Sequence, residues 1–467
     1  MTNSLNLREM ALEILLEVER NGAYPNVLLK QTLDKYLYME KQERAFLTRL
    51  VEGTVERKLT LDYYLNQVSK TPVNKMKPVI RCIMRMAAYQ IFYMDAVPDS
   101  AACNEAVKLA KKKGFQTLKG FVNGVLRNLS RQKDSMIMPD AVKESVKAFS
   151  VQYSVPEWMV EKVIKDYGIE NAKNMFASLY ENVGATSIRV NNSKISTEEC
   201  IKLLEKEGVH VEKAFYVENA LEISGYDSLA FLESFEKGYF QVQDVSSMLV
   251  GLAADPKPGD KIIDICAAPG GKSIHVADLL KGTGHVEARD LTDYKVSLIE
   301  ENITRCEFEN ISAKRADALI LDEAAKETAD IVIADLPCSG LGVLKKKSDI
   351  KYRMGQSQIE ELAQLQRDIL KNAVTYVKSG GTLIYSTCTI AKEENDLQVD
   401  WILENLPLQL VSFKGCLCEE VLENTDREGV LQLLPGREKT DGFFLAKFRK
   451  TEAFLLNAYC LISMCNI

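Results

Sequence analysis

Apolar residues in the first third of the chain recur at every third or fourth position, which is the period of an amphipathic α-helix. The clearest stripe comprises Leu7, Met10, Ala11, Ile14, Leu15 and Val18. The same spacing predicts further helices over residues 43–55, 78–93, 101–112 and 121–130. Because this stretch lacks the alternation of a half-buried strand, the pattern predicts an all-α bundle at residues 1–135.

The pattern changes after a polar, charge-rich connection at residues 136–150. Pro156 then stands where the first turn of a helix accepts proline. Residues 186–191 alternate like a strand, 197–207 have helical spacing, and 220–223 again resemble a strand. We expect a small α+β module at residues 151–235 that binds RNA. Arg189 and Asn191 suit RNA contacts, but partly exposed strand residues of these types are more often only solvated, so neither is assigned to a site.

From residue 236 to 450, strand patterns alternate with helical ones, which is typical of a parallel sheet with helices on both faces. Residues 261–265 form the first predicted strand, and a turn rich in glycine and alanine follows at 266–272. Its small residues let a ligand approach the backbone closely, before a helix that begins near Ser273. The turn has neither the G-x-G-x-x-G spacing of dinucleotide folds nor a complete P-loop. We therefore predict a Rossmann-like domain that binds another nucleotide-like cofactor.

Three acidic residues, Asp290, Asp317 and Asp335, follow successive predicted strands. In a doubly wound sheet the carboxyl ends of the strands line one crevice. A carboxylate after the second strand can accept the ribose hydroxyls, and one after the third can accept the adenine amino group, which suits S-adenosylmethionine. A single aspartate at such a place is often a helix cap. Three in succession favour a cofactor site.

Two cysteines stand just past apolar runs that are typical of buried strands. They are found in Asp335-Leu336-Pro337-Cys338-Ser339-Gly340 and in Tyr385-Ser386-Thr387-Cys388-Thr389. Free cysteine is among the most buried residue types, but two cysteines in matching positions favour thiolate chemistry over packing. With the cofactor turn upstream, the pair points to covalent methyl transfer to a pyrimidine.

Composition restricts the classes of protein that remain. The chain has 467 residues, enough for two or three domains, with 11 cysteines and only three histidines. No disulfide framework is implied, and we expect reduced thiols in a cytoplasmic monomer without a membrane segment. The histidines have no ligand-like spacing, so we predict neither a metal site nor a Ser-His-Asp triad.

The apolar tail at 451–467 is too short to span a bilayer, which takes about 20 apolar residues. We assign it no function.

Charge is distributed unevenly along the chain. The net charge is −7, yet residues 1–135 carry 22 Lys and Arg against 14 Asp and Glu, a net +8 that leaves −15 for the remainder. A basic bundle attracts RNA phosphates. Solvated helix faces are the alternative explanation, and the three lysines at 111–113 also suit the end of a helix, where cations interact favourably with the dipole.

Several short motifs of the first third stand at residues 44–46, 50–54, 81–90 and 120–127. Together they resemble the NusB-like fold. That resemblance covers about 130 residues and implies a surface that contacts RNA, although some members of the fold bind proteins as well.

A second set of motifs stands at residues 241–244, 264–272, 335–342, 345–351, 385–389, 435–436 and 441–444. With them, the chain up to about residue 450 resembles the RsmB (Sun/Fmu) family of bacterial small-subunit ribosomal RNA cytosine-5 methyltransferases. Two positions depart from the family pattern: Leu336 replaces the commoner alanine, and Arg289 is an unusual neighbour for the ribose carboxylate. The implied substrate is 16S ribosomal RNA before subunit assembly.

The resemblance also implies roles for individual residues. The cofactor contacts would be Cys266, Ala267, Ala268, Pro269, Gly270, Gly271, Lys272, Asp290, Asp317 and Asp335. Cys388 would be the nucleophile that adds to carbon 6, Cys338 would assist product release, and Asp335 would activate the base at ring nitrogen 3. The base that removes the carbon 5 proton is not identified.

Three other functions stay open at this point. The first is cytosine-5 methylation of another RNA, such as tRNA. The second is amino-methylation, which would place an aromatic residue after a proline pair where this chain has Leu336-Pro337-Cys338. The third is an antitermination-like RNA-binding protein without catalysis, which would leave some 230 residues of cofactor-site pattern unused.

Overall fold

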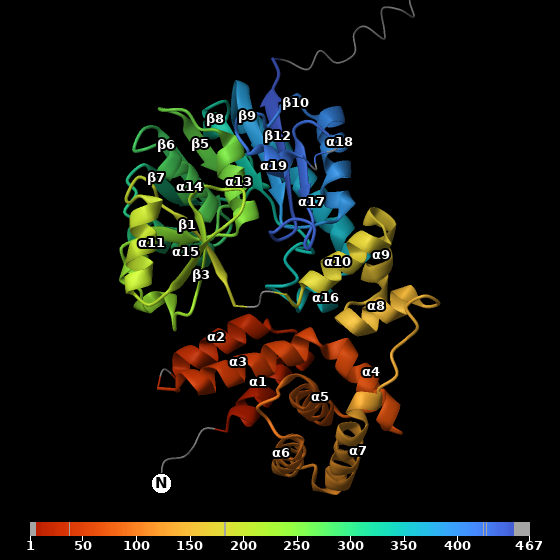
Figure 1. Ribbon diagram of the computed structural model, residues 1–467. Coiled ribbons are helices and arrows are strands. Elements are labelled where there is room, and N and C mark those ends of the chain that lie inside the picture. Colours follow the sequence, from red (N-terminus) through yellow and green to blue (C-terminus); the bar gives the residue numbers. More distant parts are fainter. Residues whose placement is uncertain (1–5, 37, 182–183, 424, 426, 453–467) are drawn as a thin grey trace, which may run out of the picture. The chain divides into compact units, whose positions relative to one another are not determined.

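The computed structural model describes residues 6–36, 38–181, 184–423, 425 and 427–452. The chain forms two compact units. Figure 1 shows their helices and strands, coloured along the sequence. Unit 1 comprises Met1–Leu179 together with the separate segment Leu344–Arg353, and unit 2 comprises Tyr180–Val343 and Met354–Ile467. The tail at 453–467, to which no function was assigned, lies outside the described residues.

Unit 1 is helical, as predicted for its N-terminal part. Its helices are α1 (Leu7–Asn21), α2 (Pro25–Lys35), α3 (Lys41–Glu56), α4 (Lys58–Val68), η1 (Val73–Lys75), α5 (Pro78–Tyr93), α6 (Asp99–Lys112), η2 (Gln116–Leu118), α7 (Lys119–Gln132), η3 (Lys133–Ser135), α8 (Ser145–Tyr153), α9 (Glu157–Tyr167), α10 (Ile169–Ser178) and α16 (Ile350–Arg353). Helix α5 is buried from Val79 to Ile91 except at Arg81 and forms the centre of one apolar core. Helices α2 and α4 were not predicted.

The connection predicted at residues 136–150 is only partly irregular. Helix α8 begins at Ser145, inside that stretch, because Ala148, Phe149 and Val151 are buried. Helix α9 begins directly after Pro156, as the proline predicted. Helices α8 to α10 group with unit 1.

The first part of unit 2 is a four-stranded antiparallel sheet with the order β2-β3-β1-β4. The elements are β1 (Thr186–Val190), α11 (Thr197–Lys206), β2 (His210–Lys213), β3 (Ala220–Ser224), η4 (Leu229–Phe231), α12 (Glu233–Glu236) and β4 (Phe240–Val242). Strand β4 pairs with β1, so the predicted boundary at residue 235 separates β4 from its own sheet.

Arg189 and Asn191 are fully buried, which excludes both the solvated role and the RNA contact considered from the sequence. Arg189 donates to Gln243 Oε1 at 3.0 Å and pairs with Asp278 at 3.2 Å. The side-chain amide of Asn191 donates to the carbonyl of Gly238 at 2.8 Å. Arg189 thus joins the small sheet to Asp278 in the rest of unit 2, and the amide of Asn191 does so through Cys306 Sγ at 3.6 Å.

The larger sheet has the order β10-β12-β9-β8-β5-β6-β7, with β11 beside β12. The remaining elements of unit 2 are α13 (Val245–Ala254), β5 (Lys261–Asp264), α14 (Gly271–Leu279), β6 (His285–Asp290), α15 (Asp293–Cys306), β7 (Ile311–Arg315), η5 (Glu323–Ala325), β8 (Ala329–Asp335), α17 (Gln356–Tyr376), β9 (Val377–Thr387), η6 (Lys392–Glu394), α18 (Asp396–Asn405), β10 (Leu408–Leu410), α19 (Glu419–Leu422), β11 (Val430–Leu433) and β12 (Phe443–Lys450). Strands β5 to β9 are parallel, as predicted, and β10 to β12 add an antiparallel edge.

Alternation along the parallel strands produces two cores, one on each face of the sheet. Ile262 and Ile331 pack on one face with residues of α13 and α14, whereas Ile263 and Val332 pack on the other with residues of α17 and α18. The near-continuous apolar sequence of these strands follows from burial on both faces. Rossmann-like architecture is therefore confirmed for this domain.

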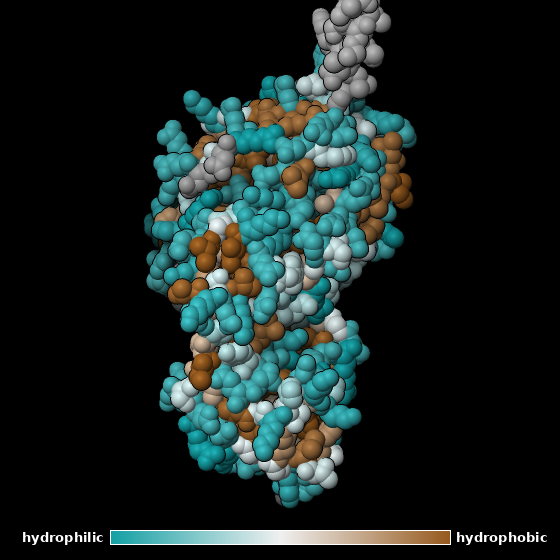
Figure 2. Space-filling model, turned by 90° about the vertical axis from the view of Figure 1, so that its right-hand side faces the viewer, coloured by the Kyte–Doolittle hydropathy of each residue, from teal (hydrophilic) through white to brown (hydrophobic). Residues whose placement is uncertain are grey.

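The surface shown in Figure 2 is mostly hydrophilic, with apolar side chains gathered in separate patches. Among the described residues, no helix is both long enough and apolar enough to cross a membrane.

Candidate active site

The predicted site residues converge because of the strand order. Strand β5 lies between β6 and β8, and β8 lies between β5 and β9. The chain runs outward through β6 and β7 on one side and through β8 and β9 on the other, which makes the carboxyl ends of β5 and β8 the point where the order reverses. Open α/β sheets bind ligands at this point.

The turn at 266–272 leads from β5 into α14. The amide of Ala267 donates to the carbonyl of Arg289 on β6 at 2.8 Å, which fixes the turn to the neighbouring strand. Gly270 has φ +103°, a left-handed conformation that favours glycine, and a Cβ atom there would lie 3.3 Å from Ile299 of α15. Glycine at position 270 is therefore favoured both by its backbone conformation and by the space that α15 leaves.

Asp290 ends β6 and is 4% exposed. Its carboxylate accepts the amide of Ala268 at 2.9 Å and that of Leu291 at 2.7 Å, and the Lys295 ammonium lies 3.0 Å away. A carboxylate has about four acceptor positions, so one remains while Lys295 is bound and two when that half-exposed lysine moves away. Asp290 is thus oriented by backbone and retains the capacity for ribose hydroxyls.

Asp317, after β7, and Arg289, in β6, stand near the same ends of the sheet. The Asp317 carboxylate accepts the amide of Leu319 at 2.9 Å, the local bond that makes aspartate common after strands. The Arg289 guanidinium pairs with Glu287 and, at 3.2 Å, with Asp322. Because successive strand residues face opposite ways, Arg289 turns away from the ribose position.

Asp335 ends β8 and forms an ion pair with Lys272, Nζ to Oδ2 at 2.8 Å. Ser386 of β9 donates to the other oxygen at 2.7 Å. Burial by itself lowers the pKa of Lys272, but the carboxyls of Asp335 and Asp264 outweigh it and raise that pKa above its ordinary value. A thiolate at Cys388 would raise the same pKa further. The pair therefore places a fixed positive charge beside the thiols.

Asp264, the last residue of β5, is a fully buried acid beneath the turn. Burial raises its pKa to about 7, although the Ser273 hydroxyl donates to the carboxyl at 2.6 Å and opposes the shift. The sequence interpretation used this residue only as the start of a motif. The structure adds it to the titrating groups of the site.

The two predicted cysteines meet at the carboxyl ends of β8 and β9. The Sγ atoms of Cys338 and Cys388 are 3.3 Å apart. The hydrogen bond with Cys388, burial, and the nearby charge of Glu394 all raise the pKa of Cys338 well above that of an ordinary thiol. Cys338 is therefore held in the protonated form, and Cys388 is the better candidate for a thiolate.

A buried polar cluster behind the thiols was missed by the sequence interpretation. Glu394 accepts the amide of Ser339 at 2.9 Å, the Ser339 hydroxyl, and the side-chain amide of Gln366 at 3.0 Å. Ser339 also bonds Thr389 at 2.7 Å, hydroxyl to hydroxyl. Since Ser339 follows Cys338 and Thr389 follows Cys388, this Glu394 clamp fixes the two cysteine loops to each other. Burial raises the pKa of Glu394.

Leu336 is buried in the core on the α17 face of the sheet. Gln366 of α17 donates to the carbonyl of the next residue, Pro337, at 2.9 Å. The core thus accommodates leucine where the family more often has alanine. The backbone of the loop is held by Gln366 and does not depend on that side chain.

Comparisons with known proteins cover all three predicted domains. Residues 251–449 match the family model described as 16S rRNA methyltransferase RsmB/F. Residues 5–131 match the NusB family, and residues 155–228 match the ferredoxin-like domain of RsmF/B-like methyltransferases. These matches confirm both resemblances found in the sequence.

The similarity extends over whole chains. The probable ribosomal RNA small subunit methyltransferase B of Bacillus subtilis strain 168 is 38% identical over 448 residues, which cover 95% of this chain and 99% of that protein. The crystal structure of PH0851 has a TM-score of 0.79 at 26% identity and covers 96% of this chain and 99% of its own. NSun6 from Pyrococcus horikoshii with SFG has a TM-score of 0.57 at 26% identity, over 64% of this chain and 99% of its own.

Proposed function

The chain belongs to the ribosomal RNA small subunit methyltransferase B family, and from that premise we propose that it methylates carbon 5 of a cytidine in 16S ribosomal RNA. The observation that carries the cytosine-5 assignment is the contact between Cys338 and Cys388, 3.3 Å from sulfur to sulfur. Carbon 5 is a poor nucleophile until a thiolate has added to carbon 6. Two thiols beside a Lys-Asp pair suit that reaction better than amino-methylation.

S-adenosylmethionine fits the residues at the strand ends. The turn at 266–272 is constrained to small residues around Gly270, and Asp290 retains acceptor capacity for ribose hydroxyls. Asp317 would accept the adenine amino group through the part of its carboxylate not used by Leu319. When bound there, this cofactor supplies an electrophilic methyl group.

The residues of the chain then have separate tasks. The Cys388 thiolate forms a bond to carbon 6, and the electron pair of the 5,6 double bond becomes available at carbon 5 for the methyl group. Negative charge that builds on the ring would be stabilised by the Lys272 ammonium, a proton donor that Asp335 holds at 2.8 Å, so Asp335 activates the base through this lysine. A base then takes the carbon 5 proton, and the bond from Cys388 to carbon 6 breaks.

Cys338 is assigned to this last stage. Its raised pKa keeps it protonated while Cys388 attacks, so it is poorly suited to compete as a nucleophile. Its thiol, in hydrogen-bond contact with the sulfur of Cys388, can donate that hydrogen bond to the thiolate as it leaves carbon 6, while keeping its own proton. This division of tasks explains why a single site holds two thiols.

Bisulfite sequencing of 16S ribosomal RNA from cells that lack the protein tests the substrate assignment. We expect one cytidine to lose its protection from conversion and to regain it when the gene is restored. Loss of protection in a tRNA instead, or unchanged conversion throughout ribosomal RNA, would contradict the assignment.

A further inference from the structure

The segment Leu344–Arg353, called the strap below, groups with the N-terminal helices although its sequence neighbours do not. Val343 before it and Met354 after it both belong to unit 2. Five residues separate Leu344 from Cys338. The strap therefore leaves the catalytic chain just after its thiol loop, contacts the helical unit, and returns.

The end of helix α3 receives two donors from the strap. The carbonyl of Glu56, the last residue of α3, accepts Lys351 Nζ at 2.9 Å and the Tyr352 hydroxyl at 3.1 Å. Carbonyls in the last turn of a helix lack partners within the helix and carry partial negative charge. Lys351 is 1% exposed, and its burial lowers its pKa to about 7. A buried lysine that donates to a carbonyl at a helix C-terminus is a specific attachment, unlike a loose surface contact.

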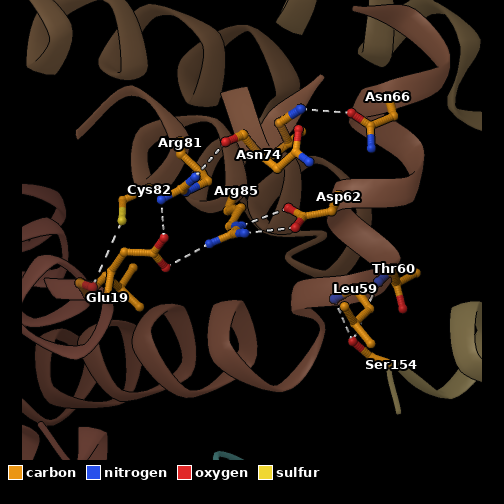
Figure 3. Close-up of polar contacts among 12 residues, drawn as sticks. Glu19, Leu59, Thr60, Asp62, Asn66, Asn74, Arg81, Cys82, Arg85 and Ser154 are labelled. Carbon is orange, nitrogen blue, oxygen red and sulfur yellow. Dashed lines mark hydrogen bonds and ion pairs between the residues drawn. The ribbon is translucent and has the colours of Figure 1, made fainter. Parts of the chain in front are cut away.

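Tyr352 joins the strap to a second place in unit 1, the C-terminal end of α8. Its hydroxyl lies 2.9 Å from the hydroxyl of Ser154, which is fully buried and accepts the amide of Leu59 at 2.8 Å, a bond visible in Figure 3. The Lys58 ammonium lies 5.0 Å from the centre of the tyrosine ring. Tyr352 also packs against the apolar core of the bundle.

Arg353 provides the third attachment. Its guanidinium donates to the carbonyls of Gly22 and Ala23, just past the end of α1, and lies 4.3 Å from the ring centre of Tyr24. Asp349 holds the same guanidinium at 2.8 Å. Three consecutive strap residues thus bind three separate parts of the bundle.

Ion pairs hold the residues of unit 1 that lie next to these contacts. Arg85 donates to both oxygens of Asp62, at 2.7 Å each, and pairs with Glu19 at 3.0 Å (Figure 3). Arg85 and Glu19 line a cavity of about 300 Å³ together with Asp349, Tyr352 and Arg353. A bidentate arginine is held in one geometry. The wall that unit 1 contributes to this cavity is therefore ordered by its own ion pairs.

The other end of the thiol loop is fixed in unit 2. The amide of Gly342 donates to the carbonyl of Cys388 at 3.1 Å, and the Gly342 carbonyl accepts the amide of Gly442 at 2.9 Å. A Cβ atom on Gly342 would lie 2.1 Å from the Gly442 oxygen, so the approach requires glycine. Only Val343 separates this backbone contact from the strap.

From these attachments we propose that the helical bundle, besides any contact with RNA, positions the thiol loop for catalysis by holding the strap. The inference has two parts: the attachment of the strap, and its effect on the rate of methyl transfer. Only the second part rests on the proposed function. A segment restrained at both ends samples fewer conformations, and small displacements of reacting groups reduce rates strongly. Lys351, Tyr352 and Arg353 are positioning residues in this account, since none is placed at the reacting atoms.

The test compares full-length Tyr352→Phe, Arg353→Gln and their combination with the wild type, with Tyr38→Phe as the matched control on an exposed tyrosine of unit 1. Hydrogen exchange of residues 344–353 measures attachment without any substrate. Each lost hydrogen bond should accelerate exchange about fivefold. Steady-state kinetics should then show a fall in kcat of similar size, with KM for RNA and for S-adenosylmethionine unchanged.

The outcomes separate this inference from the proposed function. Faster exchange in the strap with a lower kcat supports positioning. Faster exchange with a wild-type kcat overturns it, and unchanged exchange in all variants overturns the attachment itself. Absence of methyl transfer by the wild type would contradict the proposed function and the effect on the rate, while exchange would still decide the attachment.

Discussion

The sulfur atoms of Cys338 and Cys388 are in contact, 3.3 Å apart, although they belong to different strand-end loops. Two thiols at this distance do not titrate independently, because a thiolate on one disfavours a thiolate on the other. The pair therefore offers one nucleophile at a time. The charge of Glu394 lies near Cys338 and raises the pKa of that thiol. We therefore take Cys388 as the nucleophile.

Replacing Asp290 tests the cofactor site. Asp290→Ala should weaken S-adenosylmethionine binding by about 1–3 kcal/mol, because charge-assisted hydrogen bonds are lost. Titration calorimetry measures this directly. Glu287→Ala, on the same strand, is the control and should leave the affinity unchanged; equal affinities for Asp290→Ala and wild type would remove Asp290 from the site.

The Glu394 clamp should matter for turnover and not for cofactor affinity. Glu394→Gln loses the charge that Ser339 binds, and hydrogen bonds to a charged group contribute about 1.5–3 kcal/mol each. We expect kcat to fall by about 10-fold or more, with calorimetric binding of S-adenosylmethionine unchanged. Glu393→Gln, one residue earlier on η6, is the matched control. Equal kcat values for the two variants would show that the clamp has no catalytic importance.

Asp264 predicts a pH dependence of stability. Its pKa is about 7 in the folded protein and near 3.9 in an unfolded chain. Between these values the folded state binds the additional proton, so this group makes the free energy of unfolding fall as pH rises from about 4 to 7. Asp264→Asn should therefore gain thermal stability relative to the wild type between pH 5 and pH 8. A constant difference in unfolding temperature across this range would contradict the raised pKa.

Exposed lysines of the bundle should contribute to RNA binding. Lys111→Gln combined with Lys119→Gln removes two exposed charges from unit 1. If both contact phosphates, the slope of log K against log salt should decrease by about 0.7–0.9 for each. Fluorescence anisotropy with a 16S fragment measures the slope. Lys281→Gln, on an exposed turn of unit 2, is the control. Identical slopes for the double variant and the control would place the RNA elsewhere.

The parts of the site that the sequence revealed are those with local causes. The turn at 266–272 needs glycine at Gly270 because of the positive φ of that residue. Asp290 and Asp335 follow apolar strands whose pattern can be read directly from the sequence. Helices such as α5 were predicted with correct ends because Pro78 marks the start and the apolar period continues to Tyr93.

The parts that the sequence concealed depend on distant contacts. Glu394 lies in a Lys-Glu-Glu-Asn stretch that has the composition of a solvated turn, yet it is fully buried against α17 and the Ser339 loop. Arg189 is buried because Asp278, 89 residues away, compensates its charge. Strand β4 has only three residues, too few for a pattern. No local signal distinguishes such residues from exposed ones.

The division of tasks between the two thiols is tested most directly by their serine variants. Each variant is incubated with 16S RNA and S-adenosylmethionine labelled in the methyl group, and then separated by denaturing electrophoresis. Cys388→Ser should give neither methyl transfer nor adduct, because a serine hydroxyl stays protonated without a strong base. Cys338→Ser should transfer the methyl group and then accumulate a labelled, slowly migrating protein–RNA adduct. An adduct from Cys388→Ser but none from Cys338→Ser would reverse the assignment, and intact methylation without adduct in both would exclude thiolate catalysis.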